Sequence, residues 1–232
     1  MEEKTTGHIH PITLAIEEIR QIFKEIGFSV AEGPEIETEH YNFDALNVPE
    51  DHPARDMQDT FWLSPLSDRK LLRTHTSPVQ IRFMEKNQPP MAIIVPGKVY
   101  RNEATDATHG AEFYQVEGLY IDKKVSMADL KGVLLKFFKS FFGDDIEIAF
   151  RPSFFPFTEP SVEVSIKWKG KWLEVMGAGL VHPKVLEAGG IDPKEWSGFA
   201  FGGGVERLVM IKYGIEDLRS LYSGDLRVIN QF

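Results

Sequence analysis

Gly-Phe-Ala-Phe-Gly-Gly-Gly, residues 198–204, is followed directly by Val-Glu-Arg-Leu-Val-Met, residues 205–210. The alternation of aromatic and small residues predicts a strand, and the next residues predict a helix with Arg207 in its first turn. Ala200, Gly202 and Gly204 then share one strand face, which is nearly bare and leaves room for a flat ligand. The planar guanidinium of Arg207 is placed to reach that ligand's phosphates. A glycine-rich bend before a buried helix is the plainer interpretation of the same residues.

The composition indicates one large globular domain. The 232 residues are 42% hydrophobic and 26% charged, so we expect residues 1–232 to form a single domain with a substantial core. We expect no membrane span, because no run of about 18 apolar residues occurs, and the first four residues lack a signal-peptide pattern. The chain has no cysteine, which excludes disulfides and thiolate chemistry and is compatible with a cytoplasmic protein.

The charge is strongly acidic. Twenty-six basic residues stand against 35 acidic ones, which gives a net charge of −9. Phosphate contacts rely on Lys and Arg, so an acidic domain is a poor general binding surface for polyanions. If nucleic acid is a substrate, most of its contacts are expected to lie outside this chain.

Hydrophobic periodicity and turn residues predict an α+β fold, with a mostly antiparallel β-sheet flanked by α-helices. One helix is expected from Pro11 to Gly27, and another begins at Ser77, an N-cap with Gln80 completing a capping box. A third helix is expected over residues 126–142. Strands are expected at residues 28–30, 92–103, 111–121, 146–151, 161–168 and 171–176, with a hairpin loop at 104–110 and a polar surface segment at 41–60.

The predicted hairpin carries candidate binding residues. Side-chain alternation groups Val99, Arg101 and Glu103 on one strand, and Phe113, Gln115 and Glu117 on the other. For one strand alone, a solvated face of mixed charge is the simpler interpretation. Arg101 and Arg207 together supply two permanent cations, which suits a triphosphate, while Phe113 offers a stacking surface for a base. His109 is a further candidate phosphate contact, although an isolated histidine is more often simply exposed.

Two rings close to a carboxylate form another candidate site. Phe155-Pro156-Phe157 places two rings on one side of a strand, interrupted by a proline that prefers edges or bulges. Ordinary core aromatics explain this pattern, and so does a pocket wall for an aromatic or large apolar side chain. Glu159 continues the alternation and is a candidate Mg²⁺ ligand, since Mg²⁺ favours carboxylate oxygens. Beside Pro160 it is otherwise a turn residue.

Several other types of site are not supported. His8, His10 and His75 lack the spacing of zinc motifs, and no cysteine is present. The run Gly202-Gly203-Gly204 resembles neither a Walker loop nor a G-x-G-x-x-G fingerprint, which excludes P-loop and Rossmann nucleotide sites.

The motifs, taken together, resemble a known family. Tyr100-Arg101-Asn102-Glu103 is similar to the second signature motif of class II aminoacyl-tRNA synthetases, and Gly202-x-Gly204-x-Glu206-Arg207 is similar to the third. The helix from Pro11, with the short strand and Pro34, resembles the first. Five further stretches resemble bacterial-type phenylalanyl-tRNA synthetase α subunits, namely residues 7–11, 52–57, 73–78, 105–109 and 155–160. The resemblance runs from about residue 7 to residue 232 and covers the catalytic module, without that family's N-terminal helical arm.

The resemblance implies ATP as a substrate. Arg101 and Arg207 are then the catalytic residues that bind the phosphates. Glu103 and His109 help to position the nucleotide, and Phe113 stacks on adenine.

The resemblance also implies L-phenylalanine as the second substrate. Its polar groups are assigned to His75, Ser77, Gln115 and Glu117. Its ring is assigned to Phe155, Phe157 and Ala200, with edge-to-face packing on the two phenyl rings, and Gly202 is a further substrate-binding residue. Glu159 matches the family's magnesium ligand, which is shared with the β subunit.

The implied reaction has two steps. The phenylalanine carboxylate attacks the α-phosphate of ATP, and the aminoacyl group then passes to the 2′-hydroxyl of the terminal ribose of tRNA(Phe). The implied partner is the β subunit, with which the family forms a heterotetramer.

Two alternatives remain beside this interpretation: a non-charging binding or regulatory module that keeps the fold, and a ligase that adenylates an aromatic acid for another acceptor. Two positions depart from the family pattern. Gly203 stands where a larger apolar residue is expected, and Gln58 stands where some relatives have tryptophan.

Overall fold

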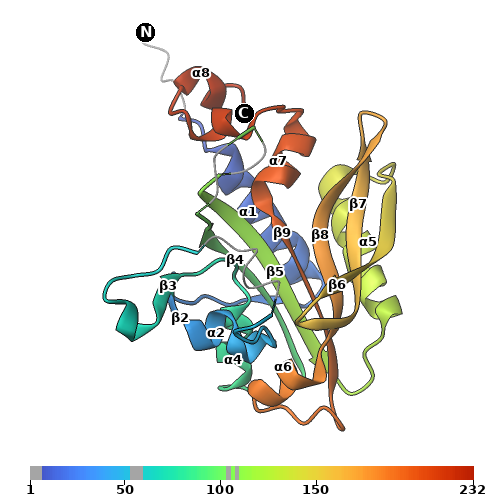
Figure 1. The fold of residues 1–232 in the computed structure, drawn as a ribbon. Coiled ribbons are helices and arrows are strands. Elements are labelled where there is room, and N and C mark those ends of the chain that lie inside the picture. Colours follow the sequence, from blue (N-terminus) through green and yellow to red (C-terminus); the bar gives the residue numbers. More distant parts are fainter. Residues whose placement is uncertain (1–6, 53–59, 103–105, 108–109) are drawn as a thin grey trace.

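A seven-stranded sheet forms the centre of the computed structural model, which describes residues 7–52, 60–102, 106–107 and 110–232 (Figure 1). The strand order is β1-β4-β5-β9-β8-β7-β6, and only β1 pairs in parallel with its neighbour, so the expected mostly antiparallel sheet is confirmed. The strands are β1 (Ser29–Val30), β4 (Met91–Tyr100), β5 (Glu112–Asp122), β6 (Ile148–Phe155), β7 (Thr158–Trp168), β8 (Lys171–Val181) and β9 (Ser197–Gly204).

Three helices cover one face of this sheet: α1 (Pro11–Glu25), α5 (Met127–Phe142) and α7 (Val205–Tyr213). The Phe201 side chain of β9 points into this layer, where the Phe23 ring of α1 lies 5.3 Å from it, centroid to centroid. Gly27 follows α1 with φ of +92°, a conformation that suits glycine and ends the helix there. The alternation along β9 therefore sends its aromatic rings to the helical layer and its small residues to the opposite face.

The opposite face is covered by short elements, which surround the site. They are α2 (Glu39–Asn42), η1 (Asp44–Leu46), α4 (Pro78–Met84), α6 (Pro183–Ala188) and a separate two-stranded sheet of β2 (Ile36–Thr38) and β3 (Lys70–Leu72), with η2 (Leu66–Asp68) before β3. The expectation of a polar surface segment at 41–60 is wrong for its first part. Phe43 and Leu46 are each 1% exposed and pack in the second hydrophobic core, because a few apolar residues between polar ones are enough to anchor a short helix.

The Phe155–Phe157 stretch also differs from expectation. Phe155 is the last residue of β6, and Phe157 lies in the turn before β7, so the two rings do not alternate along one strand. The register between β6 and β7 shifts after Ser153, which brings both rings to the same end of the sheet.

Two short elements follow α7: η3 (Leu218–Tyr222) and α8 (Leu226–Ile229). They lie beside α7 at the upper end of the molecule in Figure 1. Within the described ranges, no helix combines the length and the apolar character needed to cross a bilayer.

Candidate active site

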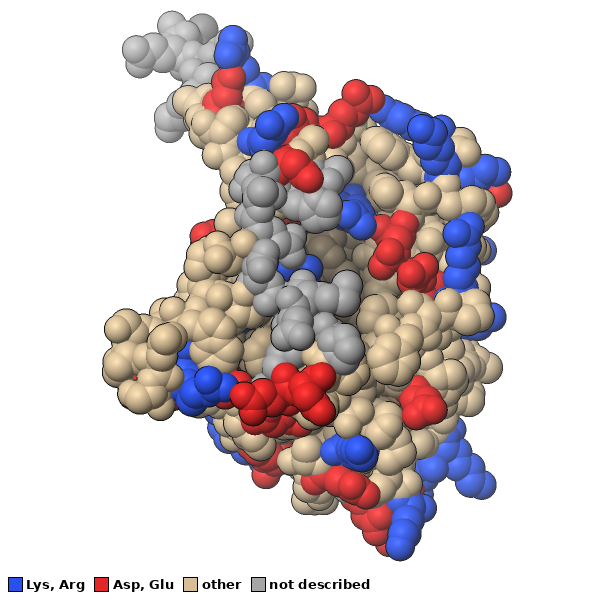
Figure 2. Space-filling view, in the orientation of Figure 1, with Lys and Arg blue, Asp and Glu red and all other residues tan. Residues whose placement is uncertain are grey.

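A cavity of about 420 Å³ opens on the sheet face away from α1 and α5. Figure 2 shows this hollow near the centre of the molecule, with both acidic and basic side chains around it. Its floor is almost bare backbone: Gly177 of β8 and Gly202 and Gly204 of β9 line it together with Ala200. A Cβ atom added to Gly204 would meet nothing within 4 Å, so the chain is open to the cavity there. The floor is therefore the bare strand face that alternation predicts.

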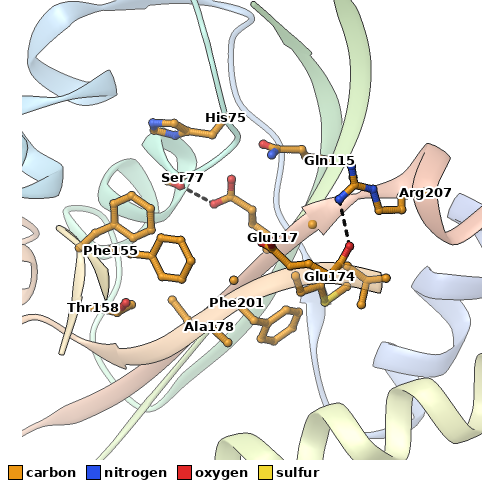
Figure 3. A pocket seen from close by; sticks show the side chains of 18 of the residues that line it. His75, Ser77, Gln115, Glu117, Phe155, Thr158, Glu174, Ala178, Phe201 and Arg207 are labelled. Atoms are coloured by element: carbon orange, nitrogen blue, oxygen red, sulfur yellow. Dashed lines mark hydrogen bonds between the residues drawn. The ribbon is translucent and has the colours of Figure 1, made fainter. Parts of the chain in front are cut away.

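The two arginines line this same cavity. Val99 of β4 lies directly opposite Phe113 of β5, so the two strand faces coincide as expected. The Arg101 guanidinium carbon lies 5.1 Å from the centroid of the Phe113 ring, and its Nε donates to the Thr74 carbonyl at 3.3 Å. Arg207 donates from Nη1 to the Glu174 carbonyl at 3.0 Å (Figure 3). Two cations and an aromatic face thus border one cavity.

The buried carboxylate of Glu117 organises the middle of the cavity. It accepts hydrogen bonds from the Thr76 backbone at 2.9 Å, the Ser77 hydroxyl at 2.5 Å and the Gln80 amide at 3.0 Å. Burial raises the pKa of Glu117, and the hydrogen bonds from Ser77 and Thr76 oppose that rise. The expected capping box at Ser77 and Gln80 is wrong, because both side chains turn to Glu117 and none caps α4. A charged acceptor offers the stronger hydrogen bond.

Three buried polar side-chain atoms of cavity-lining residues have no hydrogen-bond partner among the described residues. They are Nδ1 of His75, Oε1 of Gln115 and Oε2 of Glu206. Burial, together with the nearby Arg101 charge, lowers the pKa of His75 to about 3, so its imidazole is neutral at physiological pH. Buried polar groups are normally hydrogen-bonded, so His75 Nδ1 and Gln115 Oε1 are candidate partners for polar groups of a ligand.

The other end of the cavity is apolar. The Phe155 and Phe157 rings lie 6.2 Å apart and are parallel within 13°. A Cβ on Gly177 would come within 2.7 Å of the Phe155 ring, so that ring rests directly on the sheet. Figure 3 shows Phe155 and Thr158 on one side, Arg207 and Glu174 on the other, with Glu117 between them.

Comparison with known proteins identifies this arrangement. All of residues 1–232 match the family model for the tRNA synthetases class II core domain (F). The chain is 58% identical over 226 residues to a "Phenylalanine--tRNA ligase alpha subunit" from Prochlorococcus marinus and 59% identical over 227 residues to one from Mannheimia succiniciproducens. The chain belongs to the class II tRNA synthetases, in the same family as the phenylalanine–tRNA ligase α subunits.

The alignments cover 97% of this chain in both cases, but 66% and 68% of the two relatives, so the class II core spans about two thirds of their length. A crystal structure of pyrrolysyl-tRNA synthetase from Desulfitobacterium hafniense superposes with a TM-score of 0.72. That superposition covers 90% of this chain and 72% of the other at 23% identity, which supports the shared fold alone.

Some predicted residues lie elsewhere. Glu159 does not line the cavity of this class II core; its side chain is 77% exposed and lies 3.5 Å from the His182 ring nitrogen. Glu103, His109 and Gln58 lie outside the described residues. The remaining predicted site residues all line the cavity: His75, Ser77, Arg101, Phe113, Gln115, Glu117, Phe155, Phe157, Ala200, Gly202 and Arg207.

A glycine at position 203, where a larger apolar residue was expected, has a local explanation in this class II core. A Cβ at Gly203 would lie 2.2 Å from the Val175 carbonyl oxygen. Val175 is an extra residue in β8, where the register with β7 shifts between Val164 and Ser165. The glycine therefore allows the bulged strand to approach β9, next to the Glu174 carbonyl that holds Arg207.

Sequence reasoning missed part of the cavity wall. Leu46, Val181 and Val185 line the apolar side, while Glu174 and Leu218 line other parts. Leu46 and Val185 come from short elements on separate stretches of the chain, and no local pattern marks an apolar residue as a pocket wall. Leu218 belongs to η3, a short element that no sequence pattern predicted.

Proposed function

We propose that this chain activates L-phenylalanine with ATP to phenylalanyl-adenylate and transfers the aminoacyl group to tRNA(Phe). One observation carries the proposal: a single cavity is bordered by the guanidinium groups of Arg101 and Arg207 and by the rings of Phe155 and Phe157. The family assignment supports ATP as the nucleotide, and the apolar side suits an aromatic amino acid.

The substrates take complementary positions. Adenine stacks on Phe113, and the phosphates lie along Arg101 and Arg207, whose planar forks match phosphate oxygens. The substrate ring enters between Phe155, Phe157 and Ala200. Its ammonium and carboxylate groups meet the polar middle of the cavity, formed by His75, Ser77, Gln115, Glu117 and the backbone at Gly202.

The first step needs no protein nucleophile. A carboxylate oxygen of phenylalanine attacks the α-phosphorus in line, the bond to the bridging oxygen breaks, and pyrophosphate leaves. Arg101 and Arg207 stabilise the negative charge that spreads over the phosphoryl oxygens, and the cavity aligns the two reactants. The terminal ribose 2′-hydroxyl of tRNA(Phe) then displaces AMP from the adenylate. Because protein synthesis is cytoplasmic, the proposal places the chain there.

Magnesium belongs to the proposal only in part. The described residues of this chain contain no group of three candidate metal ligands, so they do not form a complete site by themselves. The exposed Glu159 carboxylate is an oxygen donor of the type that Mg²⁺ prefers, and we retain it as a ligand for an ion shared with a β subunit. An Mg²⁺ ion held there would supply positive charge to an anionic group of the substrates.

Phenylalanine-dependent exchange of pyrophosphate into ATP tests this function. The chain is assayed alone and with a β subunit, and we expect exchange with phenylalanine in at least one preparation. Arg207→Ala should reduce exchange by at least about 10²-fold, as the loss of a transition-state donor does. Absence of exchange in both preparations would favour the non-charging module instead.

A further inference from the structure

The C-terminal element η3 forms part of the nucleotide side of the cavity. Leu218, its first residue, lines the cavity and is 5% exposed. Its backbone N–H donates to the Ala107 carbonyl at 2.8 Å, which joins η3 to the segment between β4 and β5. A Cβ on Gly110 would lie 3.6 Å from the Leu218 side chain, so the two segments are in close contact. Residues about a hundred positions apart in the sequence thus form one wall.

The buried carboxylate of Glu206 connects η3 to β5 and α7, the two elements that carry Phe113 and Arg207 beside the position proposed for the nucleotide. Its Oε1 accepts a hydrogen bond from the Tyr114 backbone N–H at 2.7 Å and another from the Tyr222 hydroxyl. Glu206 is 2% exposed and lines the cavity. Tyr114 follows Phe113 in β5, and Arg207 follows Glu206 in α7. One carboxylate oxygen therefore fixes the strand that carries the stacking ring and the helix that carries the arginine.

Two histidines near the N-terminus, His8 and His10, contact the C-terminal segment at the same end of the molecule. His10 accepts the Ile12 N–H at Nδ1, at 3.2 Å, so its proton lies on Nε2, which donates to the Leu221 carbonyl at 2.8 Å. His8 Nδ1 lies 2.7 Å from the Phe232 carbonyl oxygen. The His10 contact holds η3 against the start of α1, and the His8 contact holds the last residue of the chain there, so Tyr222 meets Glu206 from a supported element.

We propose that Tyr222 is a positioning residue for the nucleotide, acting through Glu206. The inference rests on the proposed function, because it assumes that ATP binds beside Phe113 and Arg207. The Tyr222 hydroxyl orients the Glu206 carboxylate, and that carboxylate sets the separation of Phe113 from Arg207. Loss of the hydroxyl should therefore weaken the binding of ATP and leave the phenylalanine side of the cavity unchanged.

Equilibrium binding of each substrate to the full chain tests the proposal. The affinities for ATP and for L-phenylalanine are measured separately by titration calorimetry, for the unmodified chain and for Tyr222→Phe. We expect the dissociation constant for ATP to rise about tenfold, which corresponds to about 1.4 kcal/mol. The dissociation constant for phenylalanine should change by less than about twofold, a split that general loosening of the fold would not produce.

A matched control is available in Tyr213→Phe. Tyr213 lies at the end of α7, and within the part of the chain that the structure describes its hydroxyl has no hydrogen-bond partner. This variant should bind both substrates like the unmodified chain. Urea unfolding of both variants checks that each is folded at the titration temperature.

The outcomes separate the two proposals. If the unmodified chain binds ATP and Tyr222→Phe binds it equally well, the role of Tyr222 is wrong while the proposed function stands. An equal rise in the dissociation constants for ATP and for phenylalanine would also contradict the proposed role of Tyr222. If the unmodified chain binds no ATP either alone or with a β subunit, both proposals are overturned.

Discussion

Ala200 limits the room at the apolar side of the cavity. It is 9% exposed and lines the cavity beside the position proposed for the substrate ring. Ala200→Gly removes one methyl group from this wall, and we expect the variant to activate para-substituted phenylalanines at least about tenfold better than the unmodified chain does, relative to phenylalanine. Pyrophosphate exchange with para-chlorophenylalanine measures this ratio. An unchanged ratio would show that the para position points elsewhere.

Glu206 makes the stability of the fold depend on pH. Burial raises its pKa from 4.5 to about 7, and Glu112 adds to the rise, while the donors from Tyr222 and Tyr114 oppose it. The native state therefore binds more protons than the unfolded state between pH 4.5 and 7, so the Glu206 contribution to the free energy of unfolding falls as the pH rises through that window. Glu206→Gln has no such titration.

Denaturation by urea at several pH values measures this effect. Between pH 4.5 and 7 the unfolding free energy of the unmodified chain should fall, relative to that of Glu206→Gln, by up to about 3 kcal/mol. His75 titrates with the opposite sign, since its pKa is lowered to about 3 and unfolding exposes a more basic imidazole. Its contribution is common to both proteins and cancels in the difference. Parallel plots of unfolding free energy against pH for the two proteins would contradict the assignment of this titration to Glu206.

The bulge in β8 and the glycine run in β9 depend on each other. A side chain at Gly203 would collide with the Val175 carbonyl oxygen and lie 2.6 Å from Met176 Cγ. Backbone atoms cannot move aside cheaply, so Gly203→Ala should lower the free energy of unfolding by about 1–3 kcal/mol. Urea denaturation measures the loss.

Gly204→Ala is the matched control for that substitution. Its added Cβ meets nothing within 4 Å, and its φ of −72° suits any residue. The control should be as stable as the unmodified chain within about 0.5 kcal/mol. Equal stability of the two alanine variants would show that β8 adjusts to the extra methyl group.

Local pattern predicted the elements that carry the site better than it predicted their contacts. The strand at 197–204, the helix after it and the hairpin face with Phe113, Gln115 and Glu117 follow from period-two alternation and turn residues. Ser77 was misassigned because Glu117, 40 positions away, competes for its hydroxyl. Tertiary partners of this kind have no local signature. Tyr222 has none either, since its partner lies on another element.

At the scale of the whole molecule, charge determines what the chain can bind alone. Its net charge is −9, and Figure 2 shows acidic as well as basic side chains around the hollow. Nucleic-acid affinity comes largely from Lys and Arg contacts to phosphates. We therefore expect this chain alone to bind tRNA(Phe) at least about 10²-fold more weakly than it does together with a β subunit.

Filter binding at one fixed salt concentration compares the two preparations, because such affinities depend steeply on salt. A second measurement, with unrelated tRNA, should give the same weak binding to the chain alone. Equally tight binding of tRNA(Phe) with and without the β subunit would show that this chain supplies the main contacts itself.

Strand β5, the third strand in the sheet order, has a consequence for how the two substrates are aligned in the proposed function. Phe113, Gln115 and Glu117 follow one another at two-residue intervals on one face of β5 and all line the cavity; the proposed function assigns Phe113 to the nucleotide and the other two to the amino acid. The rise of an extended chain thus fixes the separation between the adenine position and the amino-acid position at about 13 Å over four residues. A single inserted or deleted residue between them, without a bulge such as the one in β8, would turn one of the two groups to the helical layer, so exchanges of side chains alter this face with less disturbance than changes in the strand's length.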